Sequence, residues 1–84
     1  MTKETIENEV KMIIAEIIGK NAETLDSNAS FAADLSYDSV RMLETVAVLE
    51  RKYRIRIPED YIPGIRNISN VIDIIWSIIQ EKNA

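Results

Sequence analysis

Apolar residues recur at helical spacing in the first part of the chain. The segment begins near Thr5 and ends at Gly19, and Lys, Glu and Asn fill the positions between its apolar residues. This pattern predicts an amphipathic helix. A glycine directly after the last apolar residue is well suited to close a helix in the left-handed conformation. The predicted apolar face comprises Ile6, Val10, Ile13, Ile14, Ile17 and Ile18.

Two later segments show the same periodicity and predict a second and a third long helix. One resumes at Val40 after a polar stretch. The other is expected to begin at Ser69, a residue type that commonly caps helix N-termini. The expected apolar faces are Val40, Leu43, Val46, Ala47, Leu49 or Glu50, and Tyr53 in the second helix, and Ile68, Val71, Ile72, Ile75, Ile78 and Ile79 in the third.

The first connection, residues 20 to 37, loses the periodicity and collects Asn, Asp, Ser and Ala. These residues bond locally to the backbone and favour turns, so the segment predicts a long loop. A structureless loop of this length is unusual in a small domain. We therefore expect Leu25, Phe31 and Leu35 to anchor it to the core.

The second connection alternates apolar and basic residues from Tyr53 to Ile57. Such alternation is compatible with an edge strand, but there is no second strand-like run to pair with it, so an extended connector is expected. Pro58 and the Pro63-Gly64 pair leave room for a single turn of helix at 59–62. The predicted fold is all-α: a small bundle of three main helices plus one short helix.

Composition supports one compact domain spanning residues 1–84, because 46% of the residues are apolar and 29% are charged. The chain has no Cys and no His, which excludes disulfides and argues against zinc binding and against self-contained nucleophilic catalysis. The N-terminal segment mixes charges of both signs with apolar residues, which argues against a signal peptide or a membrane span. A cytoplasmic protein that is not an enzyme is expected.

Charge is distributed unevenly along the chain. The net charge is −5 over residues 1–40 and +1 over residues 41–84. Nucleic-acid binding requires a basic face, and the only candidate is Arg51 to Arg56, which is more typical of a solvated helix end. No nucleic-acid partner is therefore expected.

A calcium-binding loop is the strongest metal candidate, and it fails in two places. Asp26, Asn28, Ser30 and Asp34 occupy positions one, three, five and nine of a twelve-residue loop. However, Phe31 stands where the sharp turn needs Gly, and Tyr37 stands where a bidentate Glu should close the coordination. No metal site is expected. Two aromatic residues, Tyr61 and Trp76, are interpreted as core or rim packing.

Ser39 occupies a distinctive position at the predicted start of the second helix. With Asp38 as the N-cap, Ser39 is the first helical residue, and its hydroxyl lies at the positive end of the helix dipole. Anions are stabilised there, so a phosphate ester on this oxygen would be well placed. From the residues alone, the pair could equally serve only to start a helix.

The string FAADLSYDSVRMLETVAVLERKYRIRIPED resembles the core of an acyl carrier protein. The shared features occur in the family's order and are Asp34-Leu35, Asp38-Ser39-Val40, Glu44, Leu49-Glu50, Tyr53 and Ile57-Pro58. The resemblance implies that Ser39 receives 4'-phosphopantetheine from coenzyme A through a separate phosphopantetheinyl transferase. Asp38 would help position that transferase and its metal-bound coenzyme A. The protein would be a monomeric carrier of acyl thioesters, served by a loading ligase or acyltransferase and by a ketosynthase.

By the same resemblance, two further sets of residues acquire expected roles. The partner-facing side of the second helix would include Val40, Arg41, Glu44, Ala47 and Val48. Other side chains would border an acyl cavity between the helices, or would be ordinary core, and these are Met42, Val46, Ile62 and Ile68.

The chain departs from the pattern of fatty-acid carriers at three points, and one is that the stretch from Pro58 to Asn67 is slightly longer than in those carriers. Ser36 replaces the usual Gly in the turn before Ser39. Arg41, Arg51 and Lys52 interrupt a helix that is strongly acidic in those carriers. Because rim charges govern orientation and association rate, we expect a specialised pathway such as polyketide or modified-lipid synthesis. An aminoacyl or peptidyl carrier, including a D-alanyl carrier, and a housekeeping fatty-acid carrier remain alternatives. The competing class is a small helical interaction module that is never modified.

Overall fold

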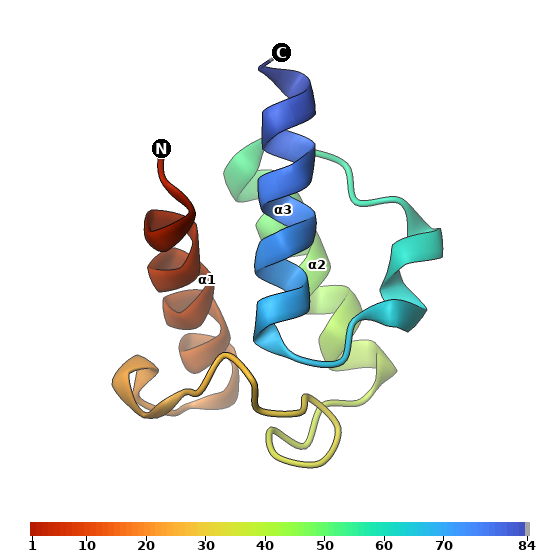
Figure 1. Ribbon diagram of the computed structural model, residues 1–84. Helices are drawn as coiled ribbons and strands as arrows, with labels where there is room; N and C mark the ends of the chain where they lie inside the picture. Colours follow the sequence, from red (N-terminus) through yellow and green to blue (C-terminus); the bar gives the residue numbers. More distant parts are fainter. Residues whose placement is uncertain (84) are drawn as a thin grey trace.

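Three long helices and two short 3₁₀ helices make up the chain in the computed structural model, which describes residues 1–83 (Figure 1). The expected domain ends at residue 84, which lies outside the described residues. The prediction of three main helices plus a short one is confirmed. The elements in order are α1 (Lys3–Ile18), η1 (Ala22–Thr24), α2 (Ser39–Tyr53), η2 (Glu59–Gly64) and α3 (Ile68–Lys82).

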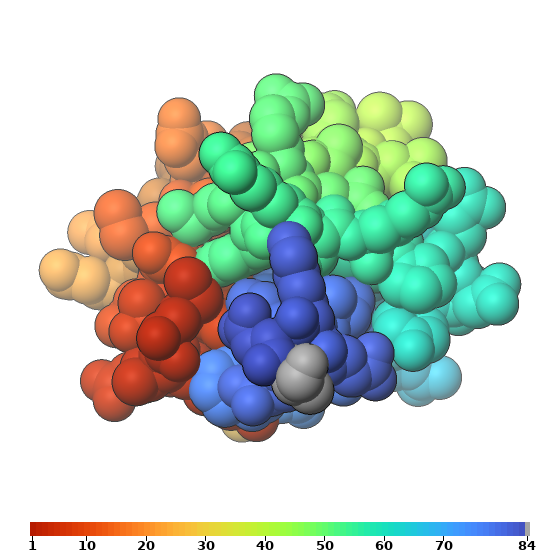
Figure 2. Space-filling model, turned by 90° about the horizontal axis from the view of Figure 1, so that it is seen from above, coloured from red at the N-terminus to blue at the C-terminus, as the bar shows by residue number. Residues whose placement is uncertain are grey.

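The helices are arranged around α3. Figure 1 shows both chain ends at one end of the bundle, whereas α2 begins at the opposite end. Seen along the bundle in Figure 2, α1 (red), α2 (green) and η2 (cyan) surround α3 (blue) on three sides. The start of α2 is therefore remote from both termini. No helix within residues 1–83 has the length and apolar character needed to cross a membrane.

The ends of α1 are closed by local hydrogen bonds. The helix starts two residues before the predicted Thr5, because the Thr2 side chain accepts a hydrogen bond from the Thr5 N–H at 3.1 Å. At the other end Gly19 adopts φ 71°, the left-handed conformation that the sequence predicted.

The apolar faces of α1 and α3 form most of the core, as predicted. Ile13, Ile17 and Ile18 at the margin of α1, and Ile78 and Ile79 at the end of α3, are half-buried. Within residues 1–83 the core is apolar except for the fully buried Thr45 side chain and the hydroxyl of the buried Tyr37. Its helical members are Ile6, Val10, Ile14 and Ala15 of α1, Met42, Val46 and Leu49 of α2, and Ile68, Val71, Ile72 and Ile75 of α3.

The buried face of α2 differs from the predicted one. Val40, Leu43 and Ala47 were expected on the apolar side, but they are exposed. The face that packs on the core instead contains Met42 and Thr45. Both sets have helical spacing, so periodicity alone could not separate them. The elements that pack against α2 decide which face is covered.

The start of α3 also corrects the prediction that Ser69 is its cap. Asn67 is the N-cap, and its side chain accepts a hydrogen bond from the Asn70 N–H at 2.8 Å, while the Asn70 side chain accepts from the Asn67 N–H. This reciprocal capping box satisfies two donors of the first turn. Ser69 lies inside the helix, and its N–H donates to the Ser27 carbonyl at 2.8 Å.

The long loop between α1 and α2 is anchored largely as predicted. Leu25 and Phe31 are buried, and Leu35 packs half-buried against the core. The one-turn helix η1 within this loop was not predicted. The Phe31 N–H donates to the Arg66 carbonyl at 2.9 Å, beside an isolated antiparallel bridge between Ser30 and Asn67. This pairing ties the loop to the segment that leads into α3.

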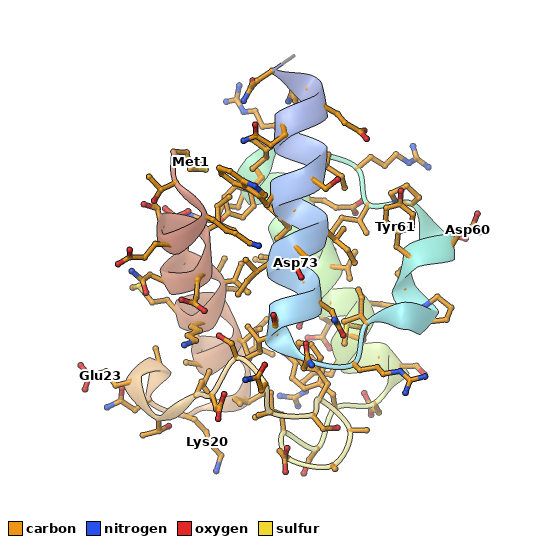
Figure 3. All side chains as sticks on the ribbon, in the orientation of Figure 1. Met1, Lys20, Glu23, Asp60, Tyr61 and Asp73 are labelled. Atoms are coloured by element: carbon orange, nitrogen blue, oxygen red, sulfur yellow. The ribbon has the colours of Figure 1, made fainter. Side chains whose placement is uncertain are left out.

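The connector after α2 begins at Arg54, which adopts a left-handed φ of 53°, and residues 1–83 contain no strand. The Glu50 carboxylate accepts the Ile57 N–H at 2.8 Å, which holds the connector against α2. The short helix η2 that follows is of the 3₁₀ type and continues through Pro63 to Gly64, beyond the predicted end at Ile62. Tyr61 of η2 is 49% exposed and lines a shallow surface groove with Asp73 of α3 (Figure 3).

Candidate functional site

Ser39 is the first residue of α2, as the sequence predicted. The Asp38 carboxylate accepts the Arg41 N–H at 2.8 Å, and the Asp38 carbonyl accepts the Met42 N–H at 3.0 Å, so Asp38 is the N-cap. The Ser39 side chain is exposed. Its hydroxyl therefore lies at the positive end of a fifteen-residue helix and is accessible to a modifying reagent.

The turn before Ser39 is made by a residue with a side chain. Ser36 adopts φ 56°, a left-handed conformation that glycine adopts without strain and that costs other residues about 1–2 kcal/mol. The serine that replaces the usual Gly of this turn therefore adopts the conformation that a glycine would adopt. The next residue, Tyr37, is buried and stacks at 4.7 Å, tilted, on Phe31. Its N–H donates to the Phe31 carbonyl at 2.8 Å.

A buried polar pair fixes this turn to α2. The Tyr37 hydroxyl lies 2.8 Å from the Thr45 hydroxyl, and the Thr45 hydroxyl donates to the Arg41 carbonyl at 2.9 Å. Because the single hydroxyl proton of Thr45 is committed to Arg41, Tyr37 is the donor in the Tyr37–Thr45 bond. Burial raises the pKa of Tyr37 above its usual value, which keeps the hydroxyl protonated.

Neither member of this pair was identified from the sequence. The only signal is that Thr45 falls, at helical spacing, between the apolar Met42 and Leu49. A buried threonine needs hydrogen-bond partners, and Tyr37 is eight residues earlier in the chain. The sequence gives no indication that their hydroxyls meet.

A groove of about 410 Å³ lies beside Ser39, between the start of α2 and the η2 segment. A second groove of about 440 Å³ adjoins it and shares Leu43 and Ile62. Most of the first groove's lining is apolar, with polar groups at Ser30, Asp38, Ser39 and Arg66. The remaining lining residues are Phe31, Ala32, Tyr37, Met42, Leu43, Ile62, Pro63 and Ile65.

Of the four residues expected to border an acyl cavity, three line a groove and one lies in the core. Met42 and Ile62 line the groove beside Ser39, whereas Val46 lines the adjoining groove. Ile68 is fully buried in the core and lines neither groove. Met42, Ile62 and Val46 therefore line the two adjoining grooves between α2 and η2.

The residues expected on a partner-facing side of α2 are exposed, with one exception. Val40 is 66% exposed, and Glu44, Ala47 and Val48 are also exposed. Leu43, which the sequence assigned to the core, is 56% exposed and belongs to the same surface. We call this surface the α2 face; it consists of Val40, Leu43, Glu44, Ala47 and Val48.

Arg41 is the exception, because its side chain is half-buried and hydrogen-bonded to α1. Its guanidinium donates to the Ile17 carbonyl at 2.9 Å, in the last turn of α1. A cation at this position interacts favourably with the carbonyl groups that end a helix. Arg41 thus joins α2 to α1.

The basic segment at the end of α2 is solvated. Arg51, Lys52, Arg54 and Arg56 are exposed, and Lys52 lies 3.8 Å from the Glu9 carboxylate. Tyr53 donates its hydroxyl hydrogen to Glu9 at 2.7 Å. Burial and this carboxylate raise the pKa of Tyr53.

The acidic residues of the rejected calcium loop serve local turns. The Asp26 carboxylate accepts the Asn28 N–H at 2.8 Å, and the Asp34 carboxylate accepts the Ser30 N–H at 2.7 Å. Over the part of the chain that the structure describes, no group of three or more carboxylates could hold a metal ion.

Comparison with known proteins places the chain in a family. The model of the family described as "Phosphopantetheine attachment site" matches residues 8–75, which include Ser39. Among solved structures, an acyl carrier protein from Enterococcus faecalis superposes with a TM-score of 0.78 at 26% identity, covering 93% of this chain and 99% of that one.

Two other solved structures are similar. A protein of Mycobacterium tuberculosis assigned as an acyl carrier protein gives a TM-score of 0.75 at 19% identity, with 89% of this chain and 95% of that chain covered, and supports the fold alone. The apo doublet acyl carrier protein from prodigiosin biosynthesis gives 0.75 at 27% identity. That match covers 88% of this chain and 36% of the doublet.

Proposed function

Since this chain belongs to the acyl carrier proteins of the phosphopantetheine attachment-site family, we propose that Ser39 is the residue that carries the 4'-phosphopantetheine. The observation that carries this proposal is the exposed Ser39 hydroxyl at the first position of α2, inside the matched residues. Proteins of this type carry acyl groups for other enzymes and are not themselves catalysts. A phosphopantetheinyl transferase and acyl-processing enzymes are accordingly the partners of the carrier.

The residues around Ser39 fit a covalently attached phosphodiester. Asp38 caps the Arg41 N–H, while the first N–H groups of α2 have no acceptor within the helix. These donors and the helix dipole favour an anion on the Ser39 oxygen. The Tyr37–Thr45 bond and the Phe31 contact hold the preceding turn, so the serine is presented on a fixed backbone.

The bound group would supply the thiol that this cysteine-free chain lacks, and that thiol holds the cargo as a thioester. The groove beside Ser39 supports a role in sheltering an apolar cargo. Met42, Leu43 and Ile62 offer it apolar contact, and burial of each CH₂ group contributes about 0.8 kcal/mol. The adjoining groove, lined by Val46, would accommodate a longer chain.

The α2 face is the surface that we assign to partner enzymes. It combines exposed apolar side chains with a single acidic residue, Glu44, next to the site of modification. Exposed apolar side chains that gather in one patch are typical of protein interaction sites. We further propose that the carrier is a monomer of one domain, residues 1–84.

The basic residues at the end of α2, beyond the α2 face, support a specialised pathway such as polyketide or modified-lipid synthesis. Arg51 and Lys52 at the end of α2, together with Arg54 and Arg56, are unsuited to a strongly basic docking patch. An aminoacyl cargo, including D-alanine, is the second candidate, because the resemblance that identifies Asp38-Ser39 extends to carriers of single amino acids.

Intact mass after incubation with coenzyme A and a promiscuous phosphopantetheinyl transferase tests the attachment site. Wild type should gain one phosphopantetheinyl group, and Ser39→Ala should gain none. Ser36→Ala is the matched control, because it removes a hydroxyl three residues away in the same turn and should be modified fully. Labelling of folded Ser39→Ala would contradict the assignment.

Charge reversal at Arg51 tests the inference about partners. Arg41 is unsuitable for this purpose because its guanidinium supports α1. If charge mismatch limits docking, Arg51→Glu should raise the turnover of the acyl-loaded protein by a fatty-acid ketosynthase several-fold at low salt, and the gain should shrink as salt is added. Unchanged turnover would remove the argument for specialised partners.

A further inference from the structure

The groove beside Ser39 contains only two charged side chains among its lining residues. One is Asp38, and the other is Arg66, which follows η2 and precedes α3. The adjoining groove, which does not contain Ser39, has Arg56 as its basic residue. Among the described residues that line the groove beside Ser39, Arg66 is therefore the one cationic residue.

The backbone of Arg66 is fixed on both sides. Its N–H donates to the Asn70 side chain at 2.9 Å, and its carbonyl accepts the Phe31 N–H at 2.9 Å. The Arg66 side chain is exposed. The ion pairs found within residues 1–83 are Lys3–Asp73 and Lys52–Glu9, so the Arg66 guanidinium has no carboxylate partner in this part of the chain.

A phosphodiester on Ser39 would lie close to another acidic group. The Asp38 carboxylate precedes Ser39 directly and accepts the Arg41 N–H, so an acidic side chain lies beside the phosphate. The guanidinium of Arg41, the nearest base in sequence, is directed to the Ile17 carbonyl. Like charges in proximity are unfavourable, and the helix dipole offsets this repulsion only in part.

We propose that Arg66 is a positioning residue that pairs with the phosphodiester of the phosphopantetheine on Ser39. This inference rests on the proposed attachment at Ser39. A guanidinium offers two parallel N–H donors to a phosphate, a stronger and more directional contact than an ammonium makes. The pair joins the segment before α3 to the start of α2, and it directs the attached arm across the groove between them.

The first test follows the Arg66 side chain by nuclear magnetic resonance. Protein with ¹⁵N-labelled arginine is divided into an apo sample and a sample modified by the transferase with coenzyme A. Intact mass confirms that the second sample is modified before the two spectra are compared. The Arg66 Nε–H resonance should move on modification, whereas that of Arg56, an exposed arginine lining the other groove, should not. An unmoved Arg66 resonance in fully modified protein would refute the pairing. A failure of the attachment proposal itself appears earlier, as the absence of the mass increment.

The second test is a thermodynamic cycle. The change in Tm from apo to modified protein is measured for wild type, Arg66→Gln and the control Arg56→Gln. Because an exposed charge pair makes a small contribution, the change in wild type should exceed that in Arg66→Gln by about 2–5 °C, and Arg56→Gln should match wild type. Equal changes in all three proteins would overturn the proposal.

The third test separates the phosphate from a charged cargo as the ligand of Arg66. The transferase is supplied with acetyl-coenzyme A or malonyl-coenzyme A in place of coenzyme A. The Arg66 resonance should move equally in all three products, since they share the phosphodiester. Movement confined to the malonyl product would assign Arg66 to a carboxylated cargo and would refute the phosphate pairing.

Discussion

The bond between Tyr37 and Thr45 is the feature whose removal is best defined by the structure. Tyr37→Phe deletes the donor and keeps the ring that packs on Phe31. Thr45 retains its bond to the Arg41 carbonyl, so no donor is stranded. Loss of one such hydrogen bond should lower the free energy of unfolding by about 1 kcal/mol. For a domain of this size, that corresponds to a fall in Tm of roughly 4–8 °C.

Thr45→Val should cost more than Tyr37→Phe. It preserves the shape of the side chain but leaves the buried Tyr37 hydroxyl without its acceptor, and burial of an unsatisfied polar group costs about 1–3 kcal/mol. In the double variant the stranded hydroxyl is absent, so its destabilisation should be smaller than the sum of the two single effects. The difference measures the coupling between the two residues.

Urea unfolding followed by circular dichroism supplies these free energies. Tyr61→Phe is the matched control, because Tyr61 is half-exposed on η2, and its change should stay within about 0.5 kcal/mol. If Tyr37→Phe were no more destabilising than Tyr61→Phe, or if the two single effects simply added, the assignment of Tyr37 as the donor to Thr45 would be wrong.

Tyr37→Phe should also change how the stability of the protein responds to alkaline pH. Burial raises the pKa of Tyr37 above its unfolded value of 10.0, so the neutral hydroxyl stabilises the folded state below pH 10. This contribution is lost as the pH rises above 10 through the folded-state pKa. Wild type should therefore lose stability in that range, and Tyr37→Phe should lose less. Identical alkaline profiles would contradict the burial of this hydroxyl.

Four further substitutions test other contacts by urea unfolding. Arg41→Ala removes the hydrogen bond to the Ile17 carbonyl and should destabilise the protein by about 1 kcal/mol, and no measurable loss would refute the tie between α2 and α1. Asn67→Ala removes the capping box and should lower the free energy of unfolding by about 1 kcal/mol, whereas Ser69→Ala should lower it by less than about 0.5 kcal/mol. A larger loss for Ser69→Ala than for Asn67→Ala would show that Ser69 is the cap. Ser36→Gly relieves the left-handed conformation and should raise the free energy of unfolding by up to about 1 kcal/mol, whereas a loss would show that the serine side chain itself stabilises the turn.

Local patterns were enough to predict the helices and the start of α2. Helical periodicity and capping depend on residues three or four positions apart, so the Asp38-Ser39 helix start and the Gly19 end could be read directly. The prediction that Ser69 is the N-cap was wrong because Asn67 and Ser69 are both residue types that can cap a helix. The choice fell to Asn67, whose partner Asn70 completes a reciprocal pair.

Helical periodicity alone could not predict which face of α2 is buried. Val40, Leu43 and Ala47 repeat at helical spacing, and so do Met42, Thr45 and Leu49. The second set is covered by the rest of the fold, and Tyr37 provides the partner that allows Thr45 to be buried. The first set was left exposed and became part of the α2 face.

What the sequence by itself determined is the chemistry of this carrier: no thiol, no histidine, and one serine at a helix start within an ordered family motif. Only the tertiary structure decided what surrounds that serine. Arg41 is bound to Ile17, twenty-four residues away, and Arg66 shares a groove with Ser39 from the far side of η2. Contacts across such separations depend on how the helices pack, and no local pattern encodes them.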